Sequence, residues 1–394
     1  MKLNLLAFNW RQTDGYGRFS ARLIEALEMQ GVTVMPHLTG AQNAPAWIQA
    51  RWNVDFRAPT VSCMPPYLLN PMPKGAGPHW LYTMTEGGAL PEGWAKSIEQ
   101  CGVSRVIVPC EHNAKVFREG GVTVPISVIW GGTDPDEFPL WTAPRPQRPY
   151  TFLTLCDRGK RKGWQEVHDA FYRAFGQASF GPQPGDQDVR LIIKGTRYGN
   201  ELIEELYAHR TGDFDQRVTY LIEDMPDIRE LYKQVDCLVL PSRTEGWGMP
   251  HREAAMMGLP VITQAHSGLD DGFTHKWAIV VEKGRMETVE DKGQNIAGQW
   301  RIADVDELAA KMRHCYETPF ATRKRAVHAR EWLWYNQTWD HTAVKLLTLM
   351  EDEGLFLPDE QDAQLAAILK ANAQYMAELE AMGYAPQEAM TWPT

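Results

Sequence analysis

The stretch from residue 238 to residue 263 reads LVLPSRTEGWGMPHREAAMMGLPVIT, and it joins a short apolar run to a glycine-rich turn and then to a helix-forming segment. The apolar run 238–240 is typical of a buried strand in a parallel sheet. Gly246 and Gly248 allow the backbone to turn sharply and to approach a ligand closely. Pro250 is favoured in the first turn of a helix. This order of strand, turn and helix predicts an α/β domain.

Two carboxylates flank the glycine turn, with Glu245 before it and Glu253 about one turn into the predicted helix. The free amides and the dipole of a helix N-terminus favour an anion such as a diphosphate. A carboxylate on each side can accept hydrogen bonds from sugar hydroxyls, so the segment predicts a nucleotide-sugar site. At helical rise the two carboxylates would lie ~12 Å apart, whereas the carboxylate pairs of glycosidases lie about 5 to 9.5 Å apart. A hydrolase is therefore disfavoured.

The segment resembles the region of retaining glycosyltransferases of family 4 (glycosyl transferases group 1) in which seven residues separate two glutamates. The resemblance implies a GT-B fold, with two Rossmann-like parallel-sheet domains facing across a cleft and C-terminal helices crossing back. It also implies a retaining reaction in which Glu245 contacts the transferred sugar and Glu253 the ribose. The other residues that it places in the donor site are Gly246, Trp247, Gly248 and Met249.

A basic turn follows the strand predicted at 151–155. Transfer of a sugar builds negative charge on the departing diphosphate, so cations must face it. Arg158 and Lys162 resemble the arginine and lysine-glycine pair of family 4, which implies that they contact the diphosphate. Lys160 and Arg161 lie between them and could take either role, so the assignment among the three residues 160–162 stays open.

The N-terminal half carries two further candidates. Gly15 and Gly17 follow a predicted strand and resemble the N-terminal glycine loop of family 4, which implies that backbone amides face the donor; a plain tight turn explains them equally well. Glu86 follows a strand predicted at 80–84, at the sheet edge where ligands of parallel sheets gather. It is the candidate for the residue nearest the acceptor hydroxyl and for the base that accepts the proton of that hydroxyl. The alternative for Glu86 is a structural cap of the next loop or helix.

The chain divides into three predicted parts. Residues 1–140 form a Rossmann-like acceptor-binding domain, 141–330 a Rossmann-like nucleotide-sugar-binding domain, and 331–394 crossover helices with an acidic helical tail. The region 45–80 is predicted to be loops. A final helix at 361–382 is expected to cover a surface or to pair with another chain, which allows a homo-oligomer. The predicted strands are 3–8, 32–35, 80–84, 106–108, 126–129, 151–155, 189–193, 218–222, 237–240 and 261–263.

Composition and charge narrow the class of protein. The net charge is −10, but residues 351–394 hold nine acids and one base, so the remainder carries −10 − (−8) = −2. A nearly neutral body disfavours broad electrostatic binding of nucleic acid. The sequence has no run of about 18 apolar residues, so no integral membrane segment is predicted. The start of the chain lacks the features of a signal peptide, and the six cysteines are scattered, so a cytoplasmic protein is expected.

Metal-binding patterns are weak. Three pairs of aspartates separated by one residue match a pattern that binds metal-diphosphate in other glycosyltransferases, but none of them ends a suitable strand. We therefore expect no metal and no cofactor besides the nucleotide-sugar donor. The pairs are Asp134 with Asp136, Asp186 with Asp188, and Asp304 with Asp306.

These observations predict a metal-independent retaining glycosyltransferase that moves a sugar from a nucleotide-diphosphate sugar to a hydroxyl acceptor. A soluble saccharide is the first candidate for the acceptor. A hydroxylated base in DNA, as phage-encoded enzymes modify, is the second. A third interpretation is a catalytically inactive partner subunit that binds the nucleotide sugar. A GT-B epimerase is less favoured, because the segment 245–250 resembles family 4. The donor sugar and its base are left open.

Overall fold

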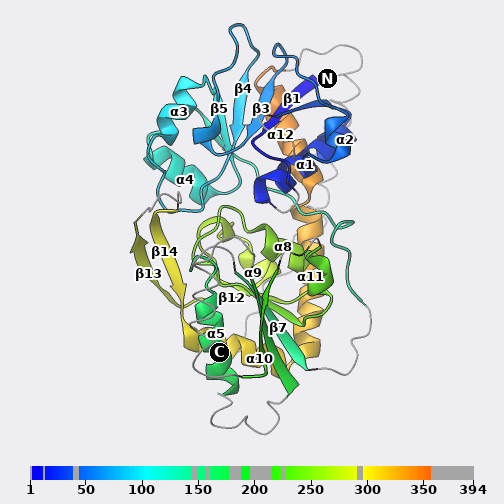
Figure 1. Cartoon of the computed structure of the whole chain (residues 1–394), viewed down its shortest axis with the longest axis vertical. Coiled ribbons are helices and arrows are strands. Elements are labelled where there is room, and N and C mark those ends of the chain that lie inside the picture. Colours follow the sequence, from blue (N-terminus) through cyan, green and yellow to red (C-terminus); the bar gives the residue numbers. More distant parts are fainter. Residues whose placement is uncertain are drawn as a thin grey trace. The chain divides into compact units, whose positions relative to one another are not determined.

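The computed structural model describes residues 2–11, 14–38, 44–142, 149–156, 160–176, 188–195, 215–223, 225, 227–290 and 296–355. The chain forms two compact units (Figure 1). The first comprises Met1–Gly132, Lys292–Ala297 and Asn336–Thr394, and the second comprises Thr133–Asp291 and Gly298–Tyr335. The chain thus leaves the first unit, builds most of the second and returns near its end.

The first unit contains a six-stranded parallel sheet in the order β2-β1-β3-β4-β5-β6. Its strands are β1 Lys2–Ala7, β2 Thr33–Leu38, β3 Thr60–Cys63, β4 His79–Tyr82, β5 Arg105–Val108 and β6 Ile126–Val128. Its helices are α1 Gly15–Met29, α2 Ala46–Gln49, the 3₁₀ turn η2 Pro66–Leu68, α3 Trp94–Gln100, α4 Glu111–Glu119 and α12 Trp339–Asp352. Strands and helices alternate along the chain, as in Rossmann-like domains.

The prediction that residues 45–80 form only loops is wrong. Strand β3 lies in this region and pairs with β1 on one side and with β4 on the other, so it occupies the middle of the sheet. All four of its residues are buried. The strand is short, and Pro59 and Pro65 lie close to its two ends. Prolines are turn signals, so the sequence pattern favoured loops in this region. Neither proline lies within the ladder.

The second unit contains a second six-stranded parallel sheet in the order β12-β11-β10-β7-β8-β9. Its strands are β7 Tyr150–Leu155, β8 Val189–Gly195, β9 Val218–Ile222, β10 Cys237–Val239, β11 Val261–Thr263 and β12 Ile279–Val280. An antiparallel ribbon joins β13 Gly284–Val289 to β14 Gly298–Ala303. Its helices are α5 Trp164–Phe175, α7 Arg229–Tyr232, α8 Met249–Met256, the 3₁₀ turn η5 Ser267–Leu269, α9 Thr274–Trp277, α10 Val305–Glu317 and α11 Pro319–Asn336.

The five strands predicted for the second unit are confirmed to within two residues. Four of them have buried apolar residues, whereas the edge strand β9 is only partly buried. Helices α5 and α10 lie toward one side of the sheet and α8 and α11 toward the other (Figure 1). A core of buried side chains links the sheet to α8 and α11, including Leu238, Met256 and Leu333. The short β12 and the ribbon were not predicted, because neither has a long apolar run.

The strand order of the second sheet fixes where a ligand site can form. From β7 the chain builds outward through β8 and β9, then returns to place β10 on the other side of β7 and builds outward through β11 and β12. The connections after β7 and β10 therefore diverge at adjacent strands, which makes this pair a topological switch point. Ligands of open α/β sheets bind outside the carboxyl ends of the strands at such a point.

The return of the chain to the first unit occurs between α11 and α12. Leu333 of α11 belongs to the core of the second unit. Thr338 begins α12 with a capping box that it forms with His341, and Trp339 packs edge-on against Phe19 in the first unit at 4.9 Å between ring centroids. The predicted return of C-terminal helices is confirmed. The helix predicted at 361–382 lies outside the described residues.

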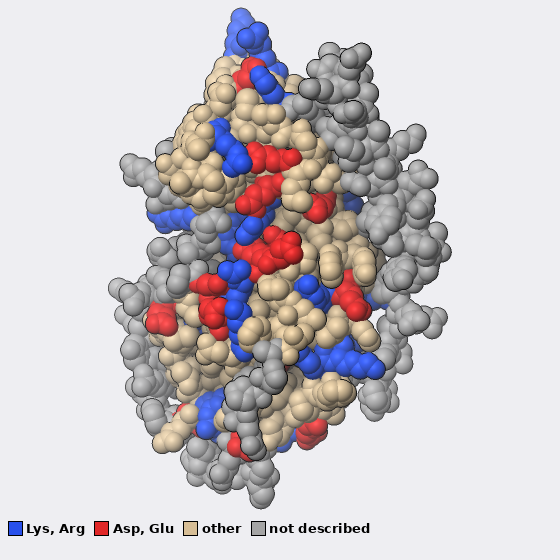
Figure 2. All heavy atoms as spheres, turned by 90° about the vertical axis from the view of Figure 1, so that its right-hand side faces the viewer, with Lys and Arg blue, Asp and Glu red and all other residues tan. Residues whose placement is uncertain are grey.

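The surface gives no sign of a single dominant charge on the face drawn in Figure 2, where basic and acidic side chains of the described residues are interspersed. Within the described ranges, none of the helices combines the length and the apolar character that crossing a bilayer would require.

Candidate functional site

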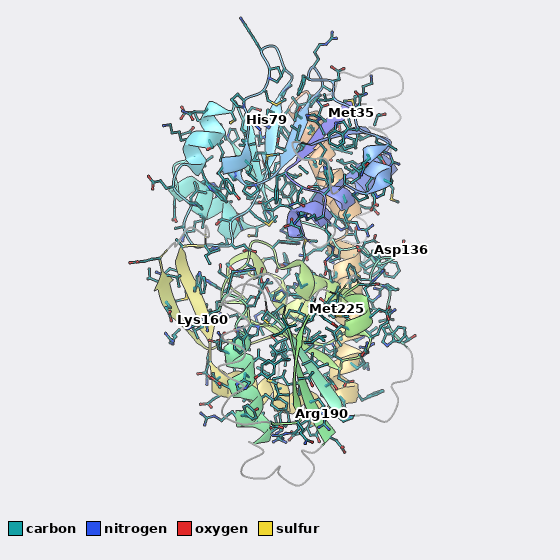
Figure 3. All side chains as sticks on the ribbon, viewed as in Figure 1. Met35, His79, Asp136, Lys160, Arg190 and Met225 are labelled. Carbon is teal, nitrogen blue, oxygen red and sulfur yellow. The ribbon has the colours of Figure 1, made fainter. Side chains whose placement is uncertain are left out.

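Three loops of the second unit meet at the carboxyl edge of its sheet. They follow β7, β10 and β11, which are neighbours in the sheet. Figure 3 shows the polarity of this edge: Lys160, which follows β7, and Met225, which follows β9, are labelled toward one end of the sheet, and Arg190 near the start of β8 toward the other. Since all these strands are parallel, the loops that follow them share one edge.

Glu245 lies at the centre of these loops, and its side chain is almost fully buried at 4% exposure. Its Oε1 accepts a hydrogen bond from Lys162 Nζ at 2.5 Å, and its Oε2 accepts one from Arg161 Nη1 at 3.1 Å. The structure thus brings together two residues that the sequence assigned to the donor site, Glu245 and Lys162. It adds Arg161, which the sequence had left as one of three alternatives.

The charge state of Glu245 follows from its neighbours. Burial alone would raise its pKa, but the charges of Lys162 and Arg161 outweigh burial and hold the pKa of the carboxyl well below its ordinary value. The carboxylate is therefore ionised at neutral pH. It can accept hydrogen bonds from hydroxyl groups, but it is a poor proton donor and a weak base.

The glycine that follows Lys162 has a steric cause. Gly163 precedes α5 with φ of 70°, a left-handed conformation that favours glycine. A Cβ at this position would lie 2.5 Å from the carbonyl oxygen of Pro241. The amide of Arg243 also donates to the carbonyl of Arg161 at 2.8 Å. These contacts join the loop after β7 to the loop after β10. Residue 163 is a glycine because a side chain there would clash with the loop after β10.

The glycine turn leads into α8 as predicted, with Gly248 at φ of 78° and Pro250 in the first turn of the helix. Glu253 lies within α8 and is 3% exposed. Because α8 begins only at Met249, the separation of ~12 Å that helical rise gives does not apply to the whole span from Glu245 to Glu253. The first part of that span is a turn, not a helix.

Trp247 is buried, and its side chain packs on a cation. The guanidinium carbon of Arg252 lies 3.6 Å from the centre of the Trp247 ring, and Arg252 also donates a hydrogen bond to the Trp247 carbonyl. Arg252 forms an ion pair with Asp271 at 2.7 Å, and both side chains are 0% exposed. The ring of Trp247 thus has a structural contact of its own, a cation–π interaction.

The loop after β11 holds the backbone of Glu245 on both sides. Ser267 Oγ accepts from the Glu245 amide at 2.8 Å, and the Gly268 amide donates to the Glu245 carbonyl at 2.8 Å. A Cβ on Gly268 would lie 2.3 Å from the Gly246 carbonyl oxygen. Among the described residues, Ser267 is the one non-glycine with positive φ, at 52°, and such strain gathers at functional sites. The sequence reasoning missed this loop, although its serine-glycine pair lies only four residues beyond the end of a predicted strand.

In the first unit, Asp14 caps α1 and uses amides of the predicted glycine loop. Its Oδ1 accepts from the amides of Tyr16 at 2.9 Å and Gly17 at 3.2 Å. A Cβ on Gly17 would lie 2.3 Å from the Arg11 carbonyl oxygen, whereas Gly15 has no neighbour within 4 Å of that position. The glycine at 17 is therefore required by packing, and its amide is engaged within the loop.

Glu86 is half-buried and lies four residues beyond the end of β4. Burial raises the pKa of Tyr16, and the negative charge of Glu86 contributes to the same shift, so the two residues are neighbours. The Tyr16 hydroxyl hydrogen-bonds to Thr83 Oγ1 and to the Met84 carbonyl, both at 3.2 Å. His79 instead lies within the sheet, bonded to Ser62 at 2.7 Å (Figure 3).

The remaining predicted residues are placed as follows. Arg158 and Asp186 lie outside the described residues. Asp134 accepts from the amides of Asp136 and Glu137 in a turn, and Asp304 caps α10 by accepting from the Glu307 amide. Within the described ranges, no group of three histidine, cysteine or acidic side chains is arranged to hold a metal ion. Metal independence stays a prediction.

His251 makes stability depend on pH. It is buried in α8, and its Nε2 donates to the Leu240 carbonyl at 2.9 Å. Burial lowers the pKa of His251 from 6.5 to about 4. Between pH 6.5 and pH 4, His251 is protonated in the unfolded chain but stays neutral in the folded chain. The free energy of unfolding therefore falls as the pH falls. We expect a loss of up to about 3 kcal/mol from pH 6.5 to 4. Urea unfolding of wild type and His251→Gln at both pH values checks this. An equal loss of unfolding free energy in the variant would contradict it.

Comparison with known proteins gives one family and several relatives. Residues 112–346 match the model of the family described as family 4 glycosyltransferase in conflict systems. The chain is 36% identical over 73 residues to an uncharacterized glycosyltransferase, number 335, of Sulfolobus islandicus rod-shaped virus 1, covering 18% of this chain and 21% of the relative. It is 30% identical over 129 residues to D-inositol 3-phosphate glycosyltransferase of Jonesia denitrificans, covering 32% and 26%. The matches thus span about a fifth to a quarter of these curated relatives.

Solved structures match over nearly the whole chain. Anabaena HepE, in complex with UDP-glucose, matches with a TM-score of 0.63 at 15% identity over 89% of this chain and 100% of that one. A trehalose-6-phosphate structure from E. coli bound with UDP-2-fluoro glucose matches with a TM-score of 0.64 at 11% identity, covering 91% and 100%. This likeness shows the GT-B fold that the sequence predicted.

Proposed function

The chain belongs to the family 4 glycosyltransferases of conflict systems, since the family model matches more than half of it, and we propose that it transfers a sugar from a UDP-sugar to a hydroxyl acceptor. The observation that carries the proposal is the cluster of Glu245, Lys162 and Arg161 at the switch point of the second sheet. A buried carboxylate held ionised beside two cations fits a ligand that carries hydroxyls next to a diphosphate. The UDP-sugars bound to the HepE and E. coli structures support the choice of donor.

The proposed roles divide between the two ends of the donor. Lys162, together with Arg158, neutralises the diphosphate, while Glu245 accepts hydrogen bonds from the sugar hydroxyls. Glu253 on α8 accepts from the ribose. Gly246, Gly248 and Met249 offer backbone amides near the N-terminus of α8, where the helix dipole favours an anion.

The proposed reaction retains the configuration of the sugar. The acceptor attacks the face that the nucleotide leaves, and the leaving phosphate oxygen accepts a hydrogen bond from the acceptor hydroxyl, whose proton then passes to Glu86. The low pKa of Glu245 supports this route, because that carboxylate is a weak base. Cations and the helix terminus replace a metal ion in neutralising the leaving group, so activity is expected to survive a chelator. Abolition of transfer by a chelator would contradict this.

The test of the proposal is release of UDP. The protein is incubated with UDP-, GDP- and ADP-glucose and other donors, with and without a panel of saccharide acceptors. We expect slow release of UDP from a UDP-sugar alone and a glycosylated product only when acceptor is present. NMR of the product identifies the configuration at the transferred carbon. Donor binding without any release would instead support the inactive partner subunit.

Glu86 is proposed as the base that accepts the acceptor proton. The substitution Glu86→Gln removes the negative charge while preserving size. Turnover is expected to fall by about 10²-fold, the lower range for general base catalysis, while the affinity for UDP stays at the wild-type value. Steady-state rates and calorimetric UDP binding measure the two effects. Turnover at the wild-type rate would leave Glu86 with a structural role only.

The proposed acceptor is a soluble saccharide, with a hydroxylated DNA base as the second candidate. The second is favoured by the match to a conflict-system family and by the relative from a virus. Hydroxymethylated and unmodified DNA are therefore compared with saccharides in the same assay. Transfer to saccharides and none to hydroxymethylated DNA supports the first candidate. The reverse pattern supports the second.

A further inference from the structure

The two cations that hold Glu245 are fixed to different degrees. The guanidinium of Arg161 donates both to Glu245 Oε2 and to the Thr244 carbonyl, at 3.1 and 3.2 Å, and the Arg161 carbonyl accepts from the Arg243 amide at 2.8 Å. Arg161 is therefore fastened to the loop after β10 at three points. It is 5% exposed, so the pair with Glu245 is shielded from water.

Lys162 is held more simply. Among the described residues, Glu245 Oε1 is the one acceptor that its ammonium group contacts, at 2.5 Å. An ammonium group has three donors, so this side chain keeps donors for a further anion. A lysine stem is also flexible, whereas the planar guanidinium of arginine has a fixed fork of donors. Of the two cations, Lys162 is thus the one suited to turn toward a diphosphate.

A buried carboxylate whose charge partner turns away becomes an uncompensated charge, which is strongly unfavourable. Resting on the function proposed above, we propose that Arg161 is a positioning residue for sugar transfer. It keeps Glu245 ionised and aimed at the sugar hydroxyls while Lys162 serves the diphosphate. Arg161 acts through Glu245 and does not itself contact the donor.

The other charged groups around Glu245 cannot take this role. His251 of α8 faces the carboxylate, but burial lowers its pKa to about 4, so it is neutral at pH 7. Arg243 and Glu166 of α5 lie beside the cluster and pair with each other at 2.5 Å. Arg252 of α8 is committed to Asp271. When Lys162 engages a diphosphate, Arg161 is the cation that still compensates Glu245.

The test compares Arg161→Gln and Arg161→Lys with a matched control, Arg173→Gln. Arg173 lies on α5, pairs with Asp306, and its side chain is 66% exposed. Calorimetry measures the affinity for UDP and for UDP-glucose separately, since only the second carries the hydroxyls that Glu245 would bind. For Arg161→Gln we expect UDP affinity within about twofold of wild type and UDP-glucose affinity reduced about tenfold, the loss expected of one charge-assisted hydrogen bond.

The pH profile gives the second readout. Removing the Arg161 charge raises the pKa of Glu245, so kcat/KM of Arg161→Gln should fall as the solution is acidified within a range where wild type stays flat. Arg161→Lys restores the charge but cannot reach both Thr244 and Glu245, so it should recover part of the affinity and move the acid limb back toward wild type. It also tests the inference if Arg161→Gln fails to fold.

The outcomes separate the inference from the proposed function. Equal losses of UDP and UDP-glucose affinity would mean that Arg161 binds the diphosphate directly, and would overturn the inference. Wild-type affinities and a wild-type pH profile in Arg161→Gln would overturn it as well. A wild-type protein that binds neither UDP nor UDP-glucose overturns the proposed function itself.

Discussion

Replacing Asp271 with alanine is expected to lower the free energy of unfolding of the second unit by about 3–5 kcal/mol, the cost of leaving a buried ion without its partner. Asp271 and Arg252 form an ion pair at 2.7 Å in which both side chains are 0% exposed. Asp271 Oδ1 also accepts from the Phe273 amide at 2.8 Å. The variant would therefore leave the Arg252 charge buried between the rings of Trp247 and Trp277 without a carboxylate.

The control for this prediction is the neighbouring substitution Asp270→Ala. Asp270 is exposed, so the same chemical change there should alter stability by no more than about 0.5 kcal/mol. Urea unfolding followed by tryptophan fluorescence measures both variants. The double variant Arg252→Met/Asp271→Ala should recover much of the loss, because it removes both charges. Equal stability of the Asp270 and Asp271 variants would show that the buried pair carries no such cost.

The consequence for the donor site follows from the Arg252 contacts. Arg252 donates to the Trp247 carbonyl, which lies in the turn between Glu245 and Glu253. The ion pair that holds Arg252 therefore also stabilises this turn. Partial unfolding of this turn would free both glutamates. We therefore interpret Arg252 and Asp271 as structural support for the two carboxylates and not as donor contacts.

The sequence predicted the elements of the second unit well because their signals are local. Each long strand is an apolar run, and Gly248 and Pro250 mark the start of α8. In the first unit, β3 escaped prediction because its signal is short and bounded by prolines. The lesson is physical: a four-residue strand is stabilised mainly by its neighbours β1 and β4, and that information is not contained in its own residues.

The assembly of the site was harder to predict, because it depends on strand order. The loops after β7, β10 and β11 come together only because β10 is inserted between β7 and β11 in the sheet. Arg161 and Lys162 are adjacent in sequence, and no local pattern tells that both reach Glu245. Ser267 likewise gains its role from the position of its loop beneath Glu245. Motifs thus proposed candidate residues, while the contacts that those residues make depended on the fold.

Replacing Lys162 with alanine is expected to reduce kcat by about two to three orders of magnitude, the usual effect of removing one group that stabilises charge developing in the transition state. Lys162 Nζ lies 2.5 Å from Glu245, and in the proposed reaction it faces the departing diphosphate. Arg161 remains to compensate Glu245, so the fold of the site should survive. Steady-state kinetics with a UDP-sugar, together with thermal unfolding, checks both statements.

The effects of Lys162→Ala on kcat and on KM distinguish stabilisation of the leaving group from simple binding of the diphosphate. Negative charge on the leaving oxygen grows as the glycosidic bond breaks, so a cation that faces it binds the transition state more tightly than the donor. The loss should therefore appear mainly in kcat, with a smaller rise in KM. Lys283→Ala, which removes an exposed lysine of the same unit, should leave both constants near wild type. A variant Lys162→Ala that raises KM alone would show that this lysine binds the diphosphate equally in both states and does not promote its departure.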